Sequence, residues 1–264
     1  MEYEERLCLF IDILGWKEAI NTLSADDLLK LLQPFMNISK VHKFHKKFIE
    51  DAKKNSKEIT ENVIKTSIGG RRILIPRLYE PVQLSIFSDT LVLSYPSIYL
   101  GRIYNELPSI INAFLVKGFI IRGGISLGHL YHKDNIIFGP ALIEAYEIES
   151  YQAIFPRILI SDAVIEKTGT DSYLPILKDQ LENWIIDPFP KLTEINYNNS
   201  QWRKYLNTNF NIERIIEIIE RNINSSQHAR LKDKWVFQAK VCALSLEKYG
   251  EATDDLILRL RNLV

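Results

Sequence analysis

The sequence predicts an α+β fold, in which helices pack on one side of a mainly antiparallel sheet. Apolar strand-like segments alternate with amphipathic segments of helical period, and turn residues separate most of them. With 264 residues, 46% of them hydrophobic, the chain can bury a substantial core. The expected order of elements is β-α-β-β-α-β-β-α-β, which is typical of layered α+β domains.

The first part of the chain predicts a strand followed by two helices. Residues 7–13 form an apolar run, and Gly15 permits a tight turn into a short helix near 17–23. Ser24 and the acidic residues after it have the pattern of a helix N-cap. A second, amphipathic helix is therefore expected from 25 towards 50.

The segment from about 51 to 79 is predicted to be an exposed insertion. It begins with a stretch rich in Lys, Asn and Ser, and it contains Gly69 and Gly70. We interpret its charges as those of a solvated loop rather than as a patch that binds nucleic acid.

The middle of the chain predicts further strands and helices. Residues 80–95 predict a strand, or a hairpin that turns at Ser88 and Asp89. Gly139 with Pro140 opens a helix that runs to about Ser150, because proline is favoured in the first helical turn. The other expected elements are a helix from Tyr99 to Lys117 interrupted at Pro108, a strand from Phe119 to Tyr131, a turn at 132–135, a strand at 157–160 and a short helix from Ser161.

After about residue 175 the pattern changes to mainly helical. We therefore divide the chain into a core at 1–175 and an extension at 176–264 that packs on the core. The extension is expected to contain an edge strand at 183–188 and helices at 212–224, 227–248 and 252–263.

Composition excludes several classes of protein. The formal net charge is zero, so no overall field attracts nucleic acid or an anionic membrane. No apolar run approaches the roughly 18–20 residues that a membrane span needs, and the acidic start lacks the features of a secretion signal. Cys8 and Cys242 lie in apolar surroundings outside any metal-binding spacing, so we expect buried free thiols in a cytoplasmic protein.

Two aspartates lie within otherwise apolar strand segments. Asp12 follows Leu7–Ile11, and Asp89 lies in Leu84–Leu93. A charge in a buried strand is costly unless something compensates it. Each aspartate could be a turn or cap residue, but two carboxylates on neighbouring strands would suit Mg²⁺ or Mn²⁺, and we favour such a metal site.

Four segments together resemble class III nucleotidyl cyclases, over roughly residues 7–165. The matching segments are Phe10–Trp16 (FIDILGW), Phe87–Thr90 (FSDT), Arg122–Gly128 (RGGISLG) and Phe138–Ala141 (FGPA). Within that family the chain looks closest to bacterial pyrimidine cyclases of Pycsar antiphage systems. The second glycine after Arg122, the helix from Gly139 to Glu149 and the run Ala153–Ile158 (AIFPRI) carry this closer resemblance.

The resemblance implies a ferredoxin-like, palm-type core and a set of site residues. Asp12 and Asp89 would each bind two divalent ions, Mn²⁺ or Mg²⁺, with the Ile13 carbonyl as a further ligand. Arg122 would contact a β- or γ-phosphate oxygen, with a surface or edge-strand arginine as the alternative. Further substrate-binding positions implied by the resemblance are Phe10 and the backbone N–H groups of Leu14, Gly15 and Trp16.

The chain also departs from the family pattern. Purine cyclases commonly carry Asn and Arg where Ile143 and Glu147 stand here, and an adenine-reading Lys and its partner Asp near Ser85 and Ile136. These absences fit another base, an inactive enzyme or a site that uses other residues. We interpret His129 and His132 as exposed turn residues. Glu144, Glu147 and Glu149 look like helix-surface charges, although Glu144 or Glu147 facing a partner subunit's site is an alternative.

The resemblance implies a function and two rivals. The first expectation is a cyclase that converts UTP, or less favourably CTP, to the 3′,5′-cyclic mononucleotide and pyrophosphate, a second messenger in antiphage defence. Its sites would be shared across a two-fold homodimer, with no nucleic-acid or membrane partner. The alternatives are an inactive cyclase-like domain that binds a nucleotide or a partner protein, and a related palm-type enzyme that forms an intermolecular bond.

Overall fold

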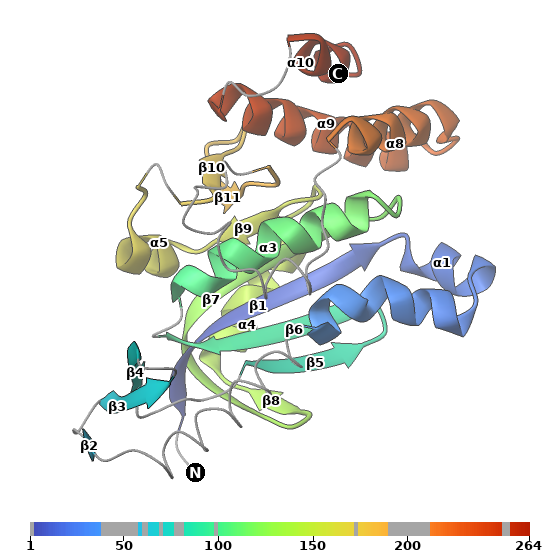
Figure 1. Ribbon diagram of the computed structural model, residues 1–264. Helices are drawn as coiled ribbons and strands as arrows, with labels where there is room; N and C mark the ends of the chain where they lie inside the picture. The colour runs from blue at the N-terminus through green and yellow to red at the C-terminus, as the bar shows by residue number, and fades with distance from the viewer. Residues whose placement is uncertain are drawn as a thin grey trace.

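The first strand, β1 (Glu4–Leu14), lies between β7 (Ile120–Lys133) and β6 (Thr90–Pro96) in an eight-stranded sheet (Figure 1). The sheet has the order β10-β11-β9-β7-β1-β6-β5, and β8 pairs with β7. The computed structural model describes residues 3–37, 58–59, 63–68, 71–76, 82–97, 100–171, 174–189, 212–249 and 254–264.

The core of this sheet has ferredoxin-like topology. Strands β1, β5 (Gln83–Phe87), β6 and β7 stand in the order β7-β1-β6-β5, and each adjacent pair among these four strands is antiparallel. Helical segments connect β1 to β5 and β6 to β7, which gives the βαββαβ order. The predicted α+β core is confirmed, and the hairpin turns where the sequence places it, between β5 and β6.

The remaining elements extend this core. A short strand, β9, runs parallel to β7, and β11 and β10 continue the sheet beyond it. The helices that connect the core strands are α1 (Trp16–Thr22), a helix over 25–37 and α3 (Leu100–Leu115). The elements that extend the core are β8 (Ile136–Phe138), α4 (Pro140–Glu147), the π-helix η2 (Ile148–Gln152), β9 (Ile158–Ile160), α5 (Asp162–Thr168), β10 (Ile176–Lys178) and β11 (Trp184–Ile186).

Helices cover both faces of the sheet, so the expectation that they lie on one side is wrong. Leu7, Leu9 and Ile11 belong to the main core cluster, together with residues of α3. The alternate residues Cys8 and Phe10 instead pack with α4 in a separate cluster. Because successive side chains of a strand point to opposite faces, α4 covers the face opposite to α3 (Figure 1).

The C-terminal helices α8 (Ile212–Ser225), α9 (Ala229–Tyr249) and α10 (Asp254–Arg261) lie at the top of Figure 1. Isoleucines of α8 and Trp235 of α9 join the main core cluster, whereas Phe237 packs in a cluster that contains Ile148 and Leu159. Helices α8 and α9 therefore contribute residues to the same clusters as the sheet, and β10 and β11 belong to that sheet. The division at residue 175 stays a prediction.

Several smaller expectations can be compared with the structure. The predicted loop within 51–79 contains a small antiparallel sheet made of β2 (Glu58–Ile59), β3 (Val63–Ile68) and β4 (Arg71–Pro76). The helix expected from 25 towards 50 is described to residue 37, and its remainder lies outside the described residues. Both cysteines are buried and free, as predicted. Within the described part of the chain, no helix is long and apolar enough to span a bilayer.

Gly124 allows α4 and η2 to approach β7 closely. A Cβ atom at this position would lie 2.5 Å from the Ala145 carbonyl oxygen and 2.7 Å from Ile148 Cβ. Backbone cannot withdraw as easily as the end of a flexible side chain, so the close approach requires glycine. The second glycine after Arg122 therefore has a packing role, at the junction between α4 and η2.

We expect Gly124→Ala to lower the free energy of unfolding by about 2 kcal/mol, because the added methyl group overpacks this contact. Gly128→Ala is the matched control on the same strand, since its Cβ would lie 3.6 Å from Ala141 Cβ, an ordinary contact. Urea denaturation of both variants measures the difference. Equal effects of the two substitutions would contradict this packing role.

Candidate functional site

The site is centred on Asp12 and Arg122, which face each other on neighbouring strands. The two residues are paired in the register of β1 and β7. Arg122 Nε donates a hydrogen bond to Asp12 Oδ2 at 3.0 Å. Both side chains remain partly accessible, with 18% exposure for Asp12 and 25% for Arg122. A ligand can therefore reach this ion pair from solvent.

Asp89 lies beside Asp12 because the hairpin between β5 and β6 turns there. Thr90, the next residue, is paired with Asp12 in the register of β1 and β6. Ile13 N donates to the Asp89 carbonyl oxygen at 3.0 Å, which fixes the turn against β1. Ser88 adopts a positive φ of 57°, so the backbone before Asp89 is in the left-handed region. The two strand aspartates are thus held on adjacent segments, as the sequence predicts.

A third carboxylate, Glu149, reaches the same cluster, and the sequence analysis missed it. Glu149 is only 3% exposed, and its Oε1 lies 2.7 Å from Arg122 Nε. Burial raises the pKa of Glu149, and repulsion from Asp12 and Asp89 adds to this, while Ser150 and Arg122 act in the opposite direction. The interpretation of Glu149 as a helix-surface charge is therefore wrong.

The π-helix η2 directs Glu149 inward. It follows α4 directly, and Ala153 N donates to the Ile148 carbonyl oxygen at 2.8 Å. Single π turns in continuous helices often mark functional sites. Arg157 closes this turn by donating from Nη2 to the Gln152 carbonyl at 3.0 Å, and its other end is ion-paired with the buried Asp179.

The C-terminal extension brings a cation to the cluster. Lys234 of α9 is half-buried, and its ammonium forms no salt bridge or hydrogen bond within the described part of the chain. Burial lowers the pKa of Lys234, and the cations of Arg122 and Arg230 lower it further, while Asp12 raises it. About one helical turn further on, Phe237 stacks on Phe155 with ring centroids 4.6 Å apart, which fixes this face of α9.

The turn after Asp12 has the geometry that its glycine suggested. Gly15 has a φ of 86° and stands at the N-cap of α1. Leu14 ends β1, and Trp16 begins α1 with its side chain buried in the main core cluster. The first N–H groups of a helix have no partner within the helix, so this turn presents donors next to Asp12. Phe10 lies on the same strand face as Asp12 and contacts Tyr146 edge to face, with centroids 5.5 Å apart.

The donor set suits a hard divalent cation that keeps water or phosphate ligands. Among the described residues, no group of three His, Cys, Asp or Glu side chains is arranged to hold a metal ion. Asp12, Asp89 and the Ile13 carbonyl instead supply only oxygen donors. Magnesium is commonly bound through one or two carboxylates, with the remaining ligands from waters and substrate phosphates. The residues present therefore fit Mg²⁺ or Mn²⁺.

A second polar network lies on the sheet face that carries Asp12. His132 Nδ1 lies 2.9 Å from Ser94 Oγ, and its Nε2 lies 3.0 Å from Ser85 Oγ. Arg6 Nε donates to Ser94 Oγ at 3.0 Å. His132 belongs to β7 and is buried, so its interpretation as an exposed turn residue is wrong. Burial lowers its pKa to about 4, with Arg6 adding to the shift, so the ring is neutral at pH 7.

The donors and acceptors around His132 determine its tautomer. Arg6 has only donors, so Ser94 Oγ accepts its N–H. The buried Ser94 hydroxyl then donates to His132 Nδ1, because no other acceptor for it is found among the described residues. His132 therefore carries its proton on Nε2 and donates to Ser85 Oγ, which leaves the proton of the half-buried Ser85 hydroxyl for an external acceptor.

Three of the four positions that depart from the cyclase pattern are exposed, whereas the fourth, Ser85, is half-buried. Ile143 and Glu147 are exposed on α4, and Ile136 is exposed on β8. The structure therefore brings together Asp12, Asp89, Arg122 and the turn after β1. It leaves Ile143 and Glu147 directed away from their own chain's core.

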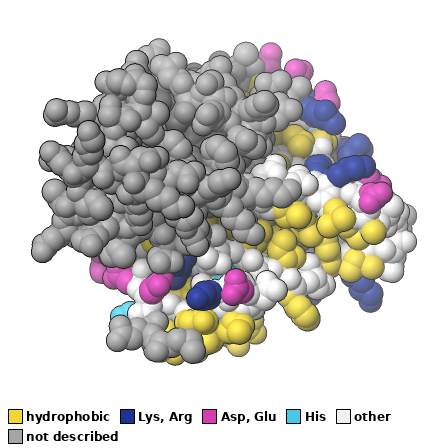
Figure 2. Space-filling model, turned by 60° about the horizontal axis from the view of Figure 1, so that its bottom comes forward, with side chains coloured by type: hydrophobic (Ala, Val, Ile, Leu, Met, Phe, Trp, Pro, Cys, Tyr) yellow, Lys and Arg dark blue, Asp and Glu magenta, His cyan; other side chains and the backbone are white. Residues whose placement is uncertain are grey.

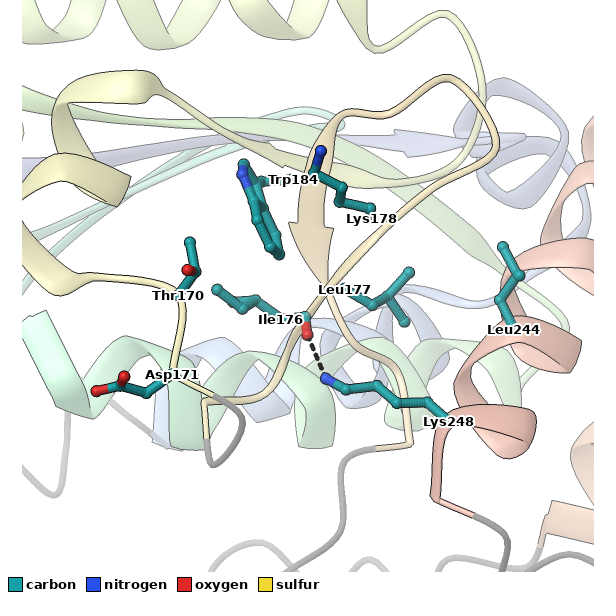
Figure 3. A pocket seen from close by; sticks show the side chains of 8 residues that line it. All are labelled: Thr170, Asp171, Ile176, Leu177, Lys178, Trp184, Leu244 and Lys248. Carbon is teal, nitrogen blue, oxygen red and sulfur yellow. Dashed lines mark hydrogen bonds between the residues drawn. The ribbon is translucent and has the colours of Figure 1, made fainter.

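A separate pocket of about 330 Å³ lies between the β10–β11 hairpin and α9 (Figure 3). It contains no member of the acidic cluster. Lys248, one of its cations, is engaged by the Ile176 carbonyl at 2.6 Å, and Lys178 lies over the Trp184 ring. The acidic cluster, formed by Asp12, Asp89 and Glu149 around Arg122, is the better candidate site. Its charged side chains lie close together, and Asp12 and Arg122 are accessible to solvent.

Comparison with known proteins finds weak structural similarity only. No protein-family profile and no curated protein sequence matches the chain. A bacterial light-regulated adenylyl cyclase is similar, with a TM-score of 0.42 and 12% identity. The alignment covers 78% of this chain and 57% of that protein. At this level of similarity, function has to be inferred from the residues of the site.

Two further solved structures are similar at the same level. The catalytic core of a rhodopsin-guanylyl cyclase with converted specificity, in complex with ATPαS, has a TM-score of 0.42 and 16% identity, covering 70% of this chain and 97% of that one. A class III adenylyl cyclase-like ATP-binding protein from Pseudomonas aeruginosa has a TM-score of 0.38 and 12% identity, covering 99% of this chain and 58% of that one.

The neutral His132 makes stability depend on pH in a defined direction. Its pKa in the folded protein is about 4, below the ordinary 6.5, so the unfolded chain takes up the proton first. Its contribution is present above pH 6.5 and is lost as the pH falls towards 4. The advantage of the wild type over His132→Gln in unfolding free energy should therefore shrink by about 2 kcal/mol between pH 7.5 and pH 5.

Urea denaturation at both pH values measures this difference, with His129→Gln at an exposed position as the matched control. A constant difference between wild type and His132→Gln across this range would show that the ring is not held neutral.

Proposed function

We propose that the protein is a class III nucleotidyl cyclase that converts UTP to 3′,5′-cyclic UMP and pyrophosphate. The observation that carries this proposal is the convergence of Asp12, Asp89 and Arg122 near the C-terminal end of β1, a central strand of the ferredoxin-like sheet. The motifs around these residues resemble pyrimidine cyclases of antiphage systems. We therefore extend the proposal to a signalling role in antiphage defence.

Asp12, Asp89 and the Ile13 carbonyl would hold two Mg²⁺ or Mn²⁺ ions. Bound there, the ions would lower the pKa of the ribose 3′-hydroxyl and neutralise charge on the leaving pyrophosphate. The 3′-oxygen bonds to the α-phosphorus, the bond from that phosphorus to the β-phosphate oxygen breaks, and the hydroxyl proton passes to solvent. The protein's own task is then mainly positioning and charge stabilisation.

Three groups would bind the phosphate chain. The backbone donors of Leu14, Gly15 and Trp16 stand at the start of α1, where anions are favoured. Arg122 would bind a β- or γ-phosphate oxygen. Lys234 supports the same role, because it is a cation near Arg122 with no carboxylate of its own in the described part of the chain. Phe10 would line the substrate on the same strand face.

The Ser85 hydroxyl supports a keto base. Its oxygen accepts from His132 and its proton is left for an acceptor, so it suits the O4 carbonyl of uracil better than the amino group of cytosine or adenine. The register of β5, β6 and β1 places Ser85 two strands from Phe10 on the face that carries Asp12. CTP is the second choice of substrate, and the resemblance alone favours a pyrimidine over guanine.

An exposed apolar surface supports a homodimer with shared sites. Large hydrophobic side chains are exposed on β8, α4 and the segment after it, although soluble monomers rarely leave such groups uncovered. Figure 2, in which the bottom of Figure 1 is turned towards the viewer, shows hydrophobic side chains at the molecular surface. The exposed large hydrophobic residues of β8, α4 and the segment after it are Ile136, Phe138, Ile143, Tyr146, Tyr151 and Ile154. Pairing through this surface would bring the 136–147 segment of a second copy towards Asp12.

A second candidate function is a cyclase-like domain that binds nucleotide without turnover. The exposed Ile143 and Glu147 favour it, because they stand where purine cyclases carry Asn and Arg. Calorimetry with UTP and Mn²⁺ separates the two functions: binding without release of pyrophosphate would support the binder.

Purified protein with Mn²⁺ should convert UTP to a 3′,5′-cyclic product, with slower conversion of the amino-base triphosphates CTP and ATP. Asp89→Ala should lower this turnover by at least about a thousandfold, because the metal ligand is lost. Mass spectrometry of products from each of the four nucleoside triphosphates measures both. A circular dichroism spectrum like that of the wild type would confirm that the variant is folded.

If none of the four triphosphates yields a cyclic mononucleotide, the proposed activity is wrong. A linear or cyclic dinucleotide product would instead indicate an enzyme that forms intermolecular bonds.

The protein should be a dimer in solution, and Ile143→Asp should convert it to an inactive monomer by placing a charge in the apolar surface. Leu258→Asp is the matched control, since it places the same charge at an exposed leucine of α10 and should stay dimeric and active. Light scattering after size-exclusion chromatography gives the oligomeric state. A wild-type protein that is monomeric yet active would overturn the shared-site arrangement.

A further inference from the structure

Two carboxylates compete for one N–H group of Arg122. The single hydrogen on Nε is directed at Asp12 Oδ2, at a distance of 3.0 Å. Glu149 Oε1 lies even closer to the same nitrogen, at 2.7 Å, but outside the direction of the N–H. It therefore forms an ion pair with Arg122 without accepting its hydrogen bond.

Glu149 Oε1 is an unsatisfied buried acceptor. It has no hydrogen-bond donor among the described residues, whereas Oε2 accepts from the Ser150 hydroxyl at 2.8 Å. The side chain is 4% exposed, so water cannot readily replace the missing donor. Leaving a charged oxygen without a donor in such a place is costly, and natural proteins seldom do so without a reason.

The two carboxylates differ in their access to solvent. Asp12 is 18% exposed and lies next to Asp89, so a divalent ion arriving from solvent meets Asp12 first. Glu149 is held on the closed side by η2, whose packing against β7 depends on the missing side chain of Gly124. The guanidinium of Arg122 therefore contacts two different carboxylates. A cation from solvent can bind Asp12, the outer one, but cannot easily reach Glu149, the inner one.

We infer that Glu149 is a positioning residue: when Asp12 binds a divalent ion, Glu149 replaces Asp12 as the acceptor of the hydrogen bond from Arg122 Nε. This inference rests on the proposed function, because only a metal-binding role for Asp12 requires the exchange. Nε is already within hydrogen-bond distance of both carboxylates, so a small rotation of the guanidinium transfers the hydrogen bond. Arg122 then remains anchored by Glu149, with its outer N–H groups directed at the phosphates.

Mn²⁺ binding without nucleotide tests this exchange. Glu149→Gln removes the carboxylate that competes for Arg122, so Arg122 keeps its ion pair with Asp12. Mn²⁺ must then displace Arg122 from Asp12, and we expect the affinity for Mn²⁺ to fall on the order of tenfold. Glu166→Gln is the control, because it removes an exposed carboxylate from α5, outside both the cluster and the proposed dimer surface. Glu149→Asp should restore part of the affinity. Isothermal titration calorimetry with MnCl₂ gives these constants.

A double-mutant cycle separates positioning from other roles of Glu149. In an Arg122→Gln background there is no guanidinium to hold, so Glu149→Gln should change Mn²⁺ affinity by less than about threefold. An equal loss in both backgrounds would show that Glu149 is itself a metal ligand or only a structural residue, and would overturn the inference. Wild-type affinity in Glu149→Gln would also overturn it. If the wild type binds no Mn²⁺ at all, the proposed function fails instead.

Discussion

The site depends on the balance of charge around one guanidinium. Asp12, Asp89 and Glu149 converge beside Arg122, and the ion pairs with Asp12 and Glu149 are formed at the same nitrogen. Three carboxylates around one arginine leave a surplus of negative charge, which Lys234 reduces from the edge. Such a surplus next to solvent favours binding of cations, and the phosphates that accompany them. The proposed chemistry follows from this imbalance.

The scaffold holds these charges at fixed positions. The register of β1 with β6 and β7 sets Asp12 beside Thr90 and Arg122. The π turn aims Glu149 at β7, and Arg157 closes that turn while its ion pair with Asp179 reaches the β10–β11 turn. Residues far apart in the sequence therefore determine the geometry around Arg122, and the C-terminal extension is part of the site's support.

The sequence predicted the strands and their aspartates because the physical signals are local. A charge within an apolar strand is conspicuous, and Gly15 marks the turn that follows. Glu149 could not be recognised, because Glu144, Glu147 and Glu149 look alike along a helix. Only the π turn rotates Glu149 inward, and nothing in the local composition marks that turn. His132 was misjudged because β7 continues past the expected end of the strand. Lys234 is one of many lysines on helix surfaces, and tertiary packing alone sets it apart.

The most direct test of the account is the location of metal in crystals grown with Mn²⁺ and a non-hydrolysable UTP analogue. Anomalous diffraction should show two manganese peaks between Asp12 and Asp89, with the nucleotide phosphates completing their coordination. Arg122 Nε should then be hydrogen-bonded to Glu149. Nucleotide bound elsewhere, or an Asp12 still paired with Arg122 while the ions lie at other residues, would contradict the account.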